Sequence, residues 1–354
     1  PLSLPNRSKK LPQTNHKRQF NKEIAIITGE LSGEIHTFHL INELKAYGDF
    51  RFSGIGSSKL KSAGVEIVYD YRNISITGLS EVLAKLHYIR NAFREIKRHL
   101  TEKRPSLLIL VDFPGFNMRI ARFAHDKGIP VIYFIPPQIW AWRKKRIYKI
   151  KKYVNKVICI LPFEKAIYDD YAVDAVYAGH PFVEIVKPSM TKEDFCKALG
   201  IDAANPVVTI MPGSRENEVR GHMPIMMDIL EAITQKARNL TILLPLAENI
   251  EQETIEKYIK EGIKIVYLKG VSYNALYCSD LAIIASGSAT LEAAILGTPT
   301  IVIYKVSAIS YMVARLIVNV RYISLPNIIA GKEVFPEYIQ TFEIEKIAEK
   351  ALYM

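Results

Sequence analysis

The sequence lacks the features that mark a membrane-spanning or secreted protein. No apolar run approaches the ~18 residues that a transmembrane helix needs. Residues 1–22 hold no apolar stretch of the kind found in a secretory signal. This first stretch is polar and basic, so we expect a disordered basic extension outside the fold. The expected location is therefore cytoplasmic.

Cysteine is scarce, and the common cofactor and nucleic-acid motifs are missing. Cys159, Cys196 and Cys278 are scattered without metal-ligand spacing, which favours buried thiols in a reducing compartment. No GxGxxG follows the first expected strand, so a dinucleotide site is not indicated. The net charge of +11 comes with no nucleic-acid-binding motif. We therefore expect no metal, no cofactor and no nucleic-acid partner.

Acidic residues are absent from residues 143–156, although the chain carries 36 of them. This basic run follows two tryptophans, and Trp beside Lys and Arg is typical of a membrane interface, where each cation contributes about 1 kcal/mol near an anionic leaflet. A solvated helix face or a nucleic-acid patch would have the same composition. The helical pattern near residues 76–100 is also amphipathic and cationic, which fits a membrane interface or packing on a sheet. The residues expected at the interface are Ile76, Leu79, Trp140, Trp142, Arg143, Lys144, Lys145 and Arg146.

Short apolar runs do occur, and they alternate with helical periodicity along the chain. The length of 354 residues favours about two domains. Strands alternating with helices predict two parallel, doubly wound α/β sheets. The clearest expected strands are 23–28, 106–111, 129–135, 207–211, 240–245, 263–268, 281–285 and 300–304.

Two strand-to-helix turns in the second half have the composition of anion sites. The first turn contains Ser286, Gly287, Ser288 and Thr290, where the chain passes from a strand into a helix. The unpaired N–H groups and the positive dipole at the start of that helix attract a diphosphate. Glu292 follows on that helix and can accept ribose hydroxyls. Ordinary helix capping explains the same residues equally well. The second turn is Gly213-Ser214-Arg215, where a guanidinium can neutralise a diphosphate.

The loops after two strands of the first half carry candidate catalytic groups. Asp112 ends the strand 106–111 beside a Pro-Gly turn, and an acceptor hydroxyl needs a positioned base to react at neutral pH. A turn-capping role for this aspartate is about equally plausible. The Gly-bounded loop that holds Glu30, Ser32 and Gly33 ends the first strand, at the edge where α/β folds bind ligands.

Eight segments together resemble the lipid-A-disaccharide synthase family, over essentially residues 23–354. The segments are TGELSGE (28–34), LVDFPGFN (110–117), PPQIWAWRKKR (136–146), LPFEKAIYDDY (161–171), AGHP (178–181), MPGSRENEV (211–219), ASGSATLEAAILGTP (285–299) and SLPNIIAG (324–331). The IWAWR, LPFEKAIYD and SLPNIIAG segments carry most of the specificity. The SGSATLEA segment alone indicates only a broader group of sugar-nucleotide transferases.

The resemblance implies an inverting, metal-independent glycosyltransferase of the GT-B architecture, with two Rossmann-like domains facing a cleft. Residues 23–186 would bind the acceptor and the membrane, 187–337 would bind the UDP-sugar donor, and 338–354 would form a helix returning toward the N-terminal domain. The implied donor is UDP-2,3-diacylglucosamine and the acceptor 2,3-diacylglucosamine 1-phosphate. The products would be a β-1,6-linked disaccharide 1-phosphate and UDP. The implied location is the anionic inner face of the inner membrane of a Gram-negative bacterium, with a homodimer left open.

The resemblance also implies roles for individual residues. Asp112 is the expected base, with Glu30 as a second catalytic candidate. The expected cleft residues are Ser32, Gly33 and Asn117, and the expected donor residues are Gly213, Ser214, Arg215, Ser286, Gly287, Ser288, Thr290, Glu292 and Asn327.

The chain departs from the family pattern at two places. Family members often have a second acid where this chain has Gly115, which gives Asp112 more weight. The chain also ends at Met354, earlier than is usual in the family. Two alternatives follow: another GT-B enzyme acting on UDP-GlcNAc, namely a 2-epimerase or a peptidoglycan GlcNAc transferase, and a catalytically silent membrane-binding homologue.

Overall fold

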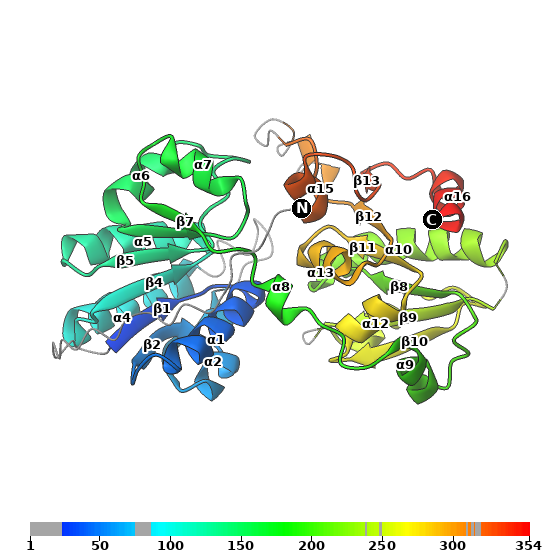
Figure 1. Ribbon diagram of the computed structural model, residues 1–354, viewed down its shortest axis with the longest axis horizontal. Helices are drawn as coiled ribbons and strands as arrows, with labels where there is room; N and C mark the ends of the chain where they lie inside the picture. The colour runs from blue at the N-terminus through cyan, green and yellow to red at the C-terminus, as the bar shows by residue number, and fades with distance from the viewer. Residues whose placement is uncertain are drawn as a thin grey trace, which may run out of the picture.

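Two parallel β-sheets, each covered by helices, form the two halves of the molecule (Figure 1). The computed structural model describes residues 23–74, 86–237, 239–247, 250–308, 311–312, 315 and 320–354. Ile76 and Leu79, which we expected at a membrane interface, lie outside these residues. None of the described helices is both long and apolar enough to cross a membrane.

The first sheet has seven parallel strands in the order β3-β2-β1-β4-β5-β6-β7. Its central strands are apolar and buried because helices cover both faces, as parallel sheets require, whereas the edge strands are more exposed. In β1, Ala25 and Ile27 face one hydrophobic cluster, whereas Ile24 and Ile26 face another. The strands are β1 (Glu23–Ile27), β2 (Arg51–Gly56), β3 (Val65–Asp70), β4 (Leu107–Val111), β5 (Val131–Phe134), β6 (Lys156–Cys159) and β7 (Ala175–Tyr177).

The helices of this half divide between the two faces of the sheet. Apolar residues of α4, α5 and α6 pack on the face of Ala25, and those of α1 and α2 pack on the other. The bounds are α1 (Leu31–Lys45), α2 (Ser58–Ser62), the 3-10 helix η1 (Tyr71–Asn73), α4 (Leu86–Lys103), α5 (Pro114–Asp126), α6 (Arg146–Tyr153), α7 (Glu164–Asp169) and α8 (Phe182–Ile185).

The second sheet has six parallel strands in the order β10-β9-β8-β11-β12-β13. The strands are β8 (Val207–Met211), β9 (Thr241–Leu246), β10 (Ile265–Lys269), β11 (Leu281–Ala285), β12 (Thr300–Tyr304) and β13 (Glu337–Ile339). The helices are α9 (Lys192–Leu199), α10 (Glu216–Thr234), α11 (Gln252–Glu256), α12 (Ser272–Cys278), α13 (Ser288–Leu296), α15 (Leu325–Ala330) and α16 (Ile344–Tyr353). The two doubly wound sheets agree with the architecture predicted from the sequence.

The last helix does not have the position that we expected. The residues Ile347, Ala348 and Ala351 of α16 join the hydrophobic cluster beneath α10, within the second half. Figure 1 places α16 at the end of the molecule far from the first sheet. The expectation that residues 338–354 return toward the N-terminal domain is therefore wrong, because the apolar face of this short helix is already buried against α10.

Apolar contacts join the two halves near α8, which lies between them in Figure 1. Phe182 and Val186 pack with Leu291 of α13 and with Leu325 and Ile329 of α15. Leu325 and Ile329 also pack against the cluster of the first sheet that includes Ile160 and Leu161. This arrangement holds the carboxyl ends of the strands of both sheets toward one another.

The strand order reverses once in each sheet, and the candidate loops lie at these points. The first reversal lies between β1 and β4, and the second lies between β8 and β11. At such a point, the loops after two adjacent strands run in opposite directions. A crevice therefore forms outside the strand ends, where α/β proteins bind ligands. The loops that begin with Gly29, Asp112, Pro212 and Ser286 all lie at these two crevices.

Candidate active site

A cavity of about 330 Å³ opens at the carboxyl ends of the strands of the first sheet, and residues of both halves line it. The first half supplies α1 and the loops after β4, β5, β6 and β7. The second half supplies Ser288 of α13 and Leu325 of α15. The polar and charged lining residues are Ser32, His36, Asp112, Gln138, Glu164, His180 and Ser288.

Asp112 lines this cavity from a turn whose backbone is tightly fixed. Asp112 and Phe113 both have φ of 46°, a left-handed conformation that is uncommon outside glycine and that recurs at functional sites. The carbonyl of Asp112 accepts hydrogen bonds from the Tyr133 hydroxyl at 2.7 Å and from Asn117 Nδ2 at 2.8 Å. These bonds hold the backbone of the turn that carries the Asp112 side chain to the cavity.

Asn117 is part of this turn, contrary to the expectation that it lines the cleft. Its side chain is fully buried, and Nδ2 donates to the carbonyls of Val111 and Asp112 at 3.1 and 2.8 Å. A side-chain amide near the end of a strand can donate hydrogen bonds to backbone carbonyls that have no partner in the sheet. Asn117 therefore positions Asp112 from below and does not reach a substrate.

The environment of Asp112 gives its carboxyl the character of a general base. Burial, and secondly the negative charge of Glu30, raise the pKa of Asp112 to about 7. A base whose pKa lies near the working pH is ionised in a useful fraction and still accepts a proton readily. At Gly115, by contrast, a side chain would meet nothing within 4 Å, so the position has room for the second acid that this chain lacks.

Glu30 is brought beside Asp112 by a close contact between two loops. A Cβ on Gly29 would lie only 2.2 Å from the ring of Phe113, so the loops after β1 and β4 can approach this closely only with glycine at position 29. Glu30 then reaches across to the second half, where its Oε2 lies 3.2 Å from Arg215 Nη2. This ion pair links the two halves at the mouth of the cleft.

The loop after β8 carries the expected diphosphate residues on an acid-stabilised turn. Gly213 has φ of 123°, and its position packs against Glu218. The Glu218 carboxylate accepts from the Ser214 N–H at 2.8 Å and from Arg215 Nη1 at 3.2 Å. This carboxylate therefore contacts the same donors that would bind a diphosphate, which shows that the turn favours anionic oxygen atoms.

The turn before α13 divides into exposed and buried residues. Ser288 faces the cavity as the first residue of α13, after Gly287 at the N-cap. Thr290 is fully buried and donates to the carbonyl of Gly287 at 2.8 Å, so the expectation that it binds the donor is wrong. Ser286 donates to the carbonyl of Ile323 at 3.0 Å, which ties this turn to the segment before α15.

Glu292 and Asn327 also have different environments. Burial raises the pKa of the half-buried Glu292 to about 7. Asn327 is fully buried; its Oδ1 accepts from the Val334 and Phe335 N–H groups, and Nδ2 donates to the Phe335 carbonyl and to Glu337. Its hydrogen-bonding capacity is thus used within its own domain, so the expectation of direct donor contact is corrected.

The two tryptophans expected at a membrane interface are both half-buried and make contacts within the protein. Trp140 donates from Nε1 to Glu164 at 3.3 Å and packs edge-on against Phe163. Trp142 lines the cavity. The indole N–H of the half-buried Trp140 is therefore satisfied within the protein by a buried carboxylate. Arg143, Lys144 and Lys145 are exposed, and Arg146 is half-buried.

Sequence reasoning missed two titratable residues that line the cavity, His36 and Glu164, and favoured a structural role for a third, His180, in its Gly-His-Pro turn. Burial is the largest cause that lowers the pKa of each histidine to about 4 and raises that of Glu164 to about 7. His180 Nδ1 accepts from the Phe182 N–H at 3.2 Å, so its proton lies on Nε2. The AGHP and LPFEKAIYDDY segments pointed to the family but gave no indication of which side chain faces the cavity.

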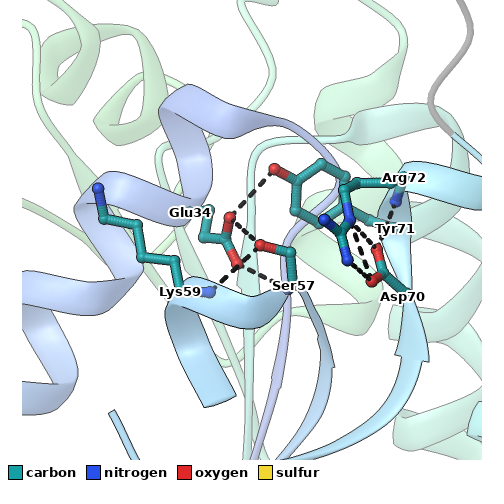
Figure 2. A network of polar contacts seen from close by, with 6 residues as sticks. All are labelled: Glu34, Ser57, Lys59, Asp70, Tyr71 and Arg72. Atoms are coloured by element: carbon teal, nitrogen blue, oxygen red, sulfur yellow. Dashed lines mark hydrogen bonds and ion pairs between the residues drawn. The ribbon is translucent and has the colours of Figure 1, made fainter. Parts of the chain in front are cut away.

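A buried network fixes the beginning of α1, from which Ser32, Gly33 and His36 reach the cavity (Figure 2). Glu34 is 1% exposed. Its carboxylate accepts from the backbone N–H and hydroxyl of Ser57 at 2.6 and 2.7 Å and from the Tyr71 hydroxyl at 3.1 Å. Charge-assisted bonds of this kind are strong in a buried setting. They anchor α1 to α2 and η1 on the side opposite the cleft.

The fold and the two-sided cleft define the class of protein. The structure is similar to the UDP-GlcNAc 2-epimerase of Neisseria meningitidis bound to UDP-GlcNAc, with a TM-score of 0.63, 16% identity, and coverage of 93% of this chain and 90% of that one. It is also similar to the calicheamicin glycosyltransferase CalG4, with a TM-score of 0.59, 13% identity, and coverage of 94% and 89%. The architecture is therefore that of the GT-B glycosyltransferases.

Sequence comparison narrows this class to one family. Residues 24–354 match the family described as Lipid-A-disaccharide synthetase. The chain is 37% identical to lipid-A-disaccharide synthase 1 of Legionella pneumophila strain Lens, over 90% of this chain and 83% of that protein. It is 38% identical to the lipid-A-disaccharide synthase of Syntrophus aciditrophicus, over 94% and 88%. The chain belongs to the lipid-A-disaccharide synthetase family and is a glycosyltransferase.

Proposed function

We propose that this protein transfers the 2,3-diacylglucosaminyl group from UDP-2,3-diacylglucosamine to 2,3-diacylglucosamine 1-phosphate. The observation that carries the proposal is the carboxyl of Asp112, whose pKa is raised to about 7, in a cavity that Ser288 at the start of α13 also lines. An acceptor-side base that faces a donor-side anion site is the arrangement that a glycosyl transfer with inversion needs.

The proposed reaction is a single displacement. Asp112 takes the proton of the acceptor C6 hydroxyl as that oxygen attacks C1 of the donor sugar from the face opposite UDP. The bond from C1 to the diphosphate breaks, and UDP leaves with the electron pair. The products are the β-1,6-linked disaccharide 1-phosphate and UDP.

The second half supports the leaving group in this proposal. Arg215 and the turn at Gly213 and Ser214 bind the diphosphate, because its oxygens resemble the carboxylate oxygens that this turn already binds. Ser288 and the backbone at Gly287 lie at the start of α13 and add donors. Glu292 binds ribose hydroxyls. Glu30 pairs with Arg215 and, after burial, is the next cause of the raised pKa of Asp112.

A mixed-micelle assay tests the reaction directly. Radiolabelled 2,3-diacylglucosamine 1-phosphate and its UDP-linked partner are incubated with the protein in detergent with EDTA. We expect a labelled disaccharide 1-phosphate, with the rate unchanged by EDTA. Release of free UDP without the lipid acceptor would instead favour a 2-epimerase. Folded protein that binds UDP and forms no disaccharide at high concentration would refute the proposal.

We further propose that the protein works at the anionic inner face of the inner membrane, where both lipid substrates reside. Lys144 and Lys145 are exposed next to α6, whose surface adds Tyr148 with 63% of its area exposed. Cations beside exposed aromatics favour an anionic lipid surface. The exposed lysines and Tyr148 therefore form the part of the expected interface that is most open to a lipid surface.

Neutralising these lysines tests the membrane proposal. The double variant Lys144→Gln/Lys145→Gln is expected to bind vesicles containing phosphatidylglycerol about fivefold to tenfold more weakly, since each cation contributes about 1 kcal/mol at most. Vesicle co-sedimentation at two salt concentrations measures the effect, with Lys269→Gln on the second sheet as the matched control. Equal binding of both proteins, independent of salt, would contradict the proposal.

A further inference from the structure

Two arginines lie against the indole of Trp142 at the wall of the cavity. The guanidinium carbon of Arg143 lies 4.6 Å from the centre of the Trp142 ring, and that of Arg146 lies 4.8 Å from it. Trp142 itself lines the cavity that contains Asp112. An arginine over an indole is held by the ring electrons and by stacking of two flat groups. Two positive charges are therefore fixed beside one ring at the edge of the candidate acceptor site.

These charges have no acidic counterpart in the part of the chain that the structure describes. No ion pair or hydrogen bond of either guanidinium occurs there, whereas Arg215 across the cleft pairs with Glu30 and Glu218. Burial, and next the charge of Arg143, lower the pKa of Arg146. The protein thus keeps two like charges close together although they repel each other.

The local backbone makes this arrangement less favourable still. α6 begins at Arg146, its N-cap is Lys145, and its first turn contains no acid. Cations at the positive end of a helix are disfavoured, and an anion there is favoured. Arg143 also has φ of 53°, which is uncommon for a residue with a side chain. An anionic group bound between the two arginines would offset their mutual repulsion and the unfavourable charge at the start of α6.

The position of the pair relative to Asp112 indicates which anion this is. The charge of Arg146 acts on the Tyr133 phenol, and the Tyr133 hydroxyl donates to the Asp112 carbonyl at 2.7 Å. Trp142, which the two arginines contact, and Asp112 line the same cavity. In the proposed acceptor, the phosphate and the reacting hydroxyl are carried by one sugar ring, so their binding groups must lie within one sugar's width.

We propose that Arg143 and Arg146, held on Trp142, bind the phosphate monoester of the acceptor sugar. This inference rests on the proposed function and adds a subsite to it. Two guanidinium groups can donate to a phosphate monoester from two sides, each through paired N–H groups. The neighbouring Lys144 and Lys145 are exposed, and in the proposed function they contact the lipid surface. The basic run therefore serves two different anions.

A phosphate group could also come from a membrane lipid, and the experiment separates the two sources. The double variant Arg143→Gln/Arg146→Gln removes both charges and keeps polar side chains of similar length. The control is Lys144→Gln/Lys145→Gln, and Arg143→Lys/Arg146→Lys keeps the charge without the paired donors. Thermal unfolding of each variant establishes that it folds. Calorimetric titration in neutral detergent micelles then measures the affinity for 2,3-diacylglucosamine 1-phosphate and for unphosphorylated 2,3-diacylglucosamine.

We expect the glutamine pair at 143 and 146 to weaken binding of the phosphorylated lipid at least about tenfold and to leave binding of the unphosphorylated lipid unchanged. The lysine pair should retain an intermediate affinity, and the control should match the parent protein in micelles. Equal affinity of the parent and the arginine variant for the phosphorylated lipid would overturn the proposal. So would an equal loss for both lipids, which would indicate a packing role for the arginines.

Vesicle binding tests whether the arginines bind the phosphate of a membrane lipid instead. If Arg143→Gln/Arg146→Gln loses binding to phosphatidylglycerol vesicles as strongly as the control does, and keeps its affinity for the phosphorylated sugar lipid, the arginines bind lipid headgroups and the proposal is wrong. Because these measurements need no turnover, they are separate from the assay of the proposed function. Phosphate-dependent binding without disaccharide formation would refute the reaction and leave the subsite standing.

Discussion

Replacing Asp112 with asparagine is expected to lower kcat by about 10²–10⁴-fold, the usual contribution of a positioned general base. The asparagine side chain has nearly the same shape but cannot accept the hydroxyl proton. The turn around it is held through the carbonyl of Asp112 by Tyr133 and Asn117, so the backbone should stay in place. Disaccharide formation in mixed micelles measures the rate, and UDP titration should give an unchanged affinity.

The pH dependence provides an independent check of this assignment. Burial and the charge of Glu30 raise the pKa of Asp112 from its ordinary value to about 7, and a base works only when it is ionised. The parent kcat/KM should therefore rise with pH and level off above about 7, and the limb at that pKa should be missing in Asp112→Asn.

The same pKa shift affects stability with a definite sign. A carboxyl whose folded-state pKa is raised binds its proton more tightly in the folded protein. Its contribution to stability is full below the unfolded pKa of about 3.9 and is lost as the pH rises through about 7. The difference in stability between Asp112→Asn and the parent should therefore grow in favour of the variant over this range.

A parent-like rate of disaccharide formation in Asp112→Asn would show that Asp112 is not the catalytic base.

Replacing Arg215 with alanine is expected to weaken UDP binding by about 1.5–3 kcal/mol, or roughly 10- to 150-fold, because a charge-assisted hydrogen bond to the diphosphate is lost. Arg215 reaches the cleft from the N-cap of α10 and lies 3.2 Å from both Glu30 and Glu218. Calorimetric titration with UDP measures the loss. Arg220→Ala on the same helix is the matched control, since that side chain is exposed.

A second variant separates direct binding from an effect through Glu30. Glu30→Gln removes the ion pair and keeps Arg215, so UDP affinity should stay within about twofold of the parent value, since no contact to UDP is lost. The acid limb of kcat/KM should move to lower pH, because one of the charges that raise the pKa of Asp112 is removed. If Arg215→Ala and Arg220→Ala bind UDP equally well, the diphosphate site lies elsewhere.

The sequence determined the architecture because the signals for it are local. Buried parallel strands are short apolar runs, and their helices carry apolar residues at helical spacing, so the two doubly wound sheets could be predicted without any contact between distant segments. The loops at the two strand-order reversals could be predicted for the same reason. Asp112, Gly213, Arg215 and Ser288 lie where strand ends and turn residues placed them.

Only the tertiary structure decided which side chains in those loops face the cleft. Asn327 and Thr290 lie in expected donor segments, yet both are fully buried. His180 lines the cavity, although its place in a Gly-His-Pro turn favoured a structural role. The direction of a side chain after a turn depends on contacts between segments far apart in sequence, such as the ring of Phe113 over Gly29.

Residues 143–156 and α16 also show which features the sequence could predict and which depend on tertiary packing. Composition predicted a surface of residues 143–156 that faces an anionic partner or solvent, but only packing showed that Trp140 contacts Glu164 and that Trp142 contacts two arginines. The apolar face of α16 could be predicted, whereas its partner, α10, could not. The sequence by itself thus determined the elements and the chemistry they carry, and the tertiary structure decided which groups meet, because burial is a property of the assembled chain.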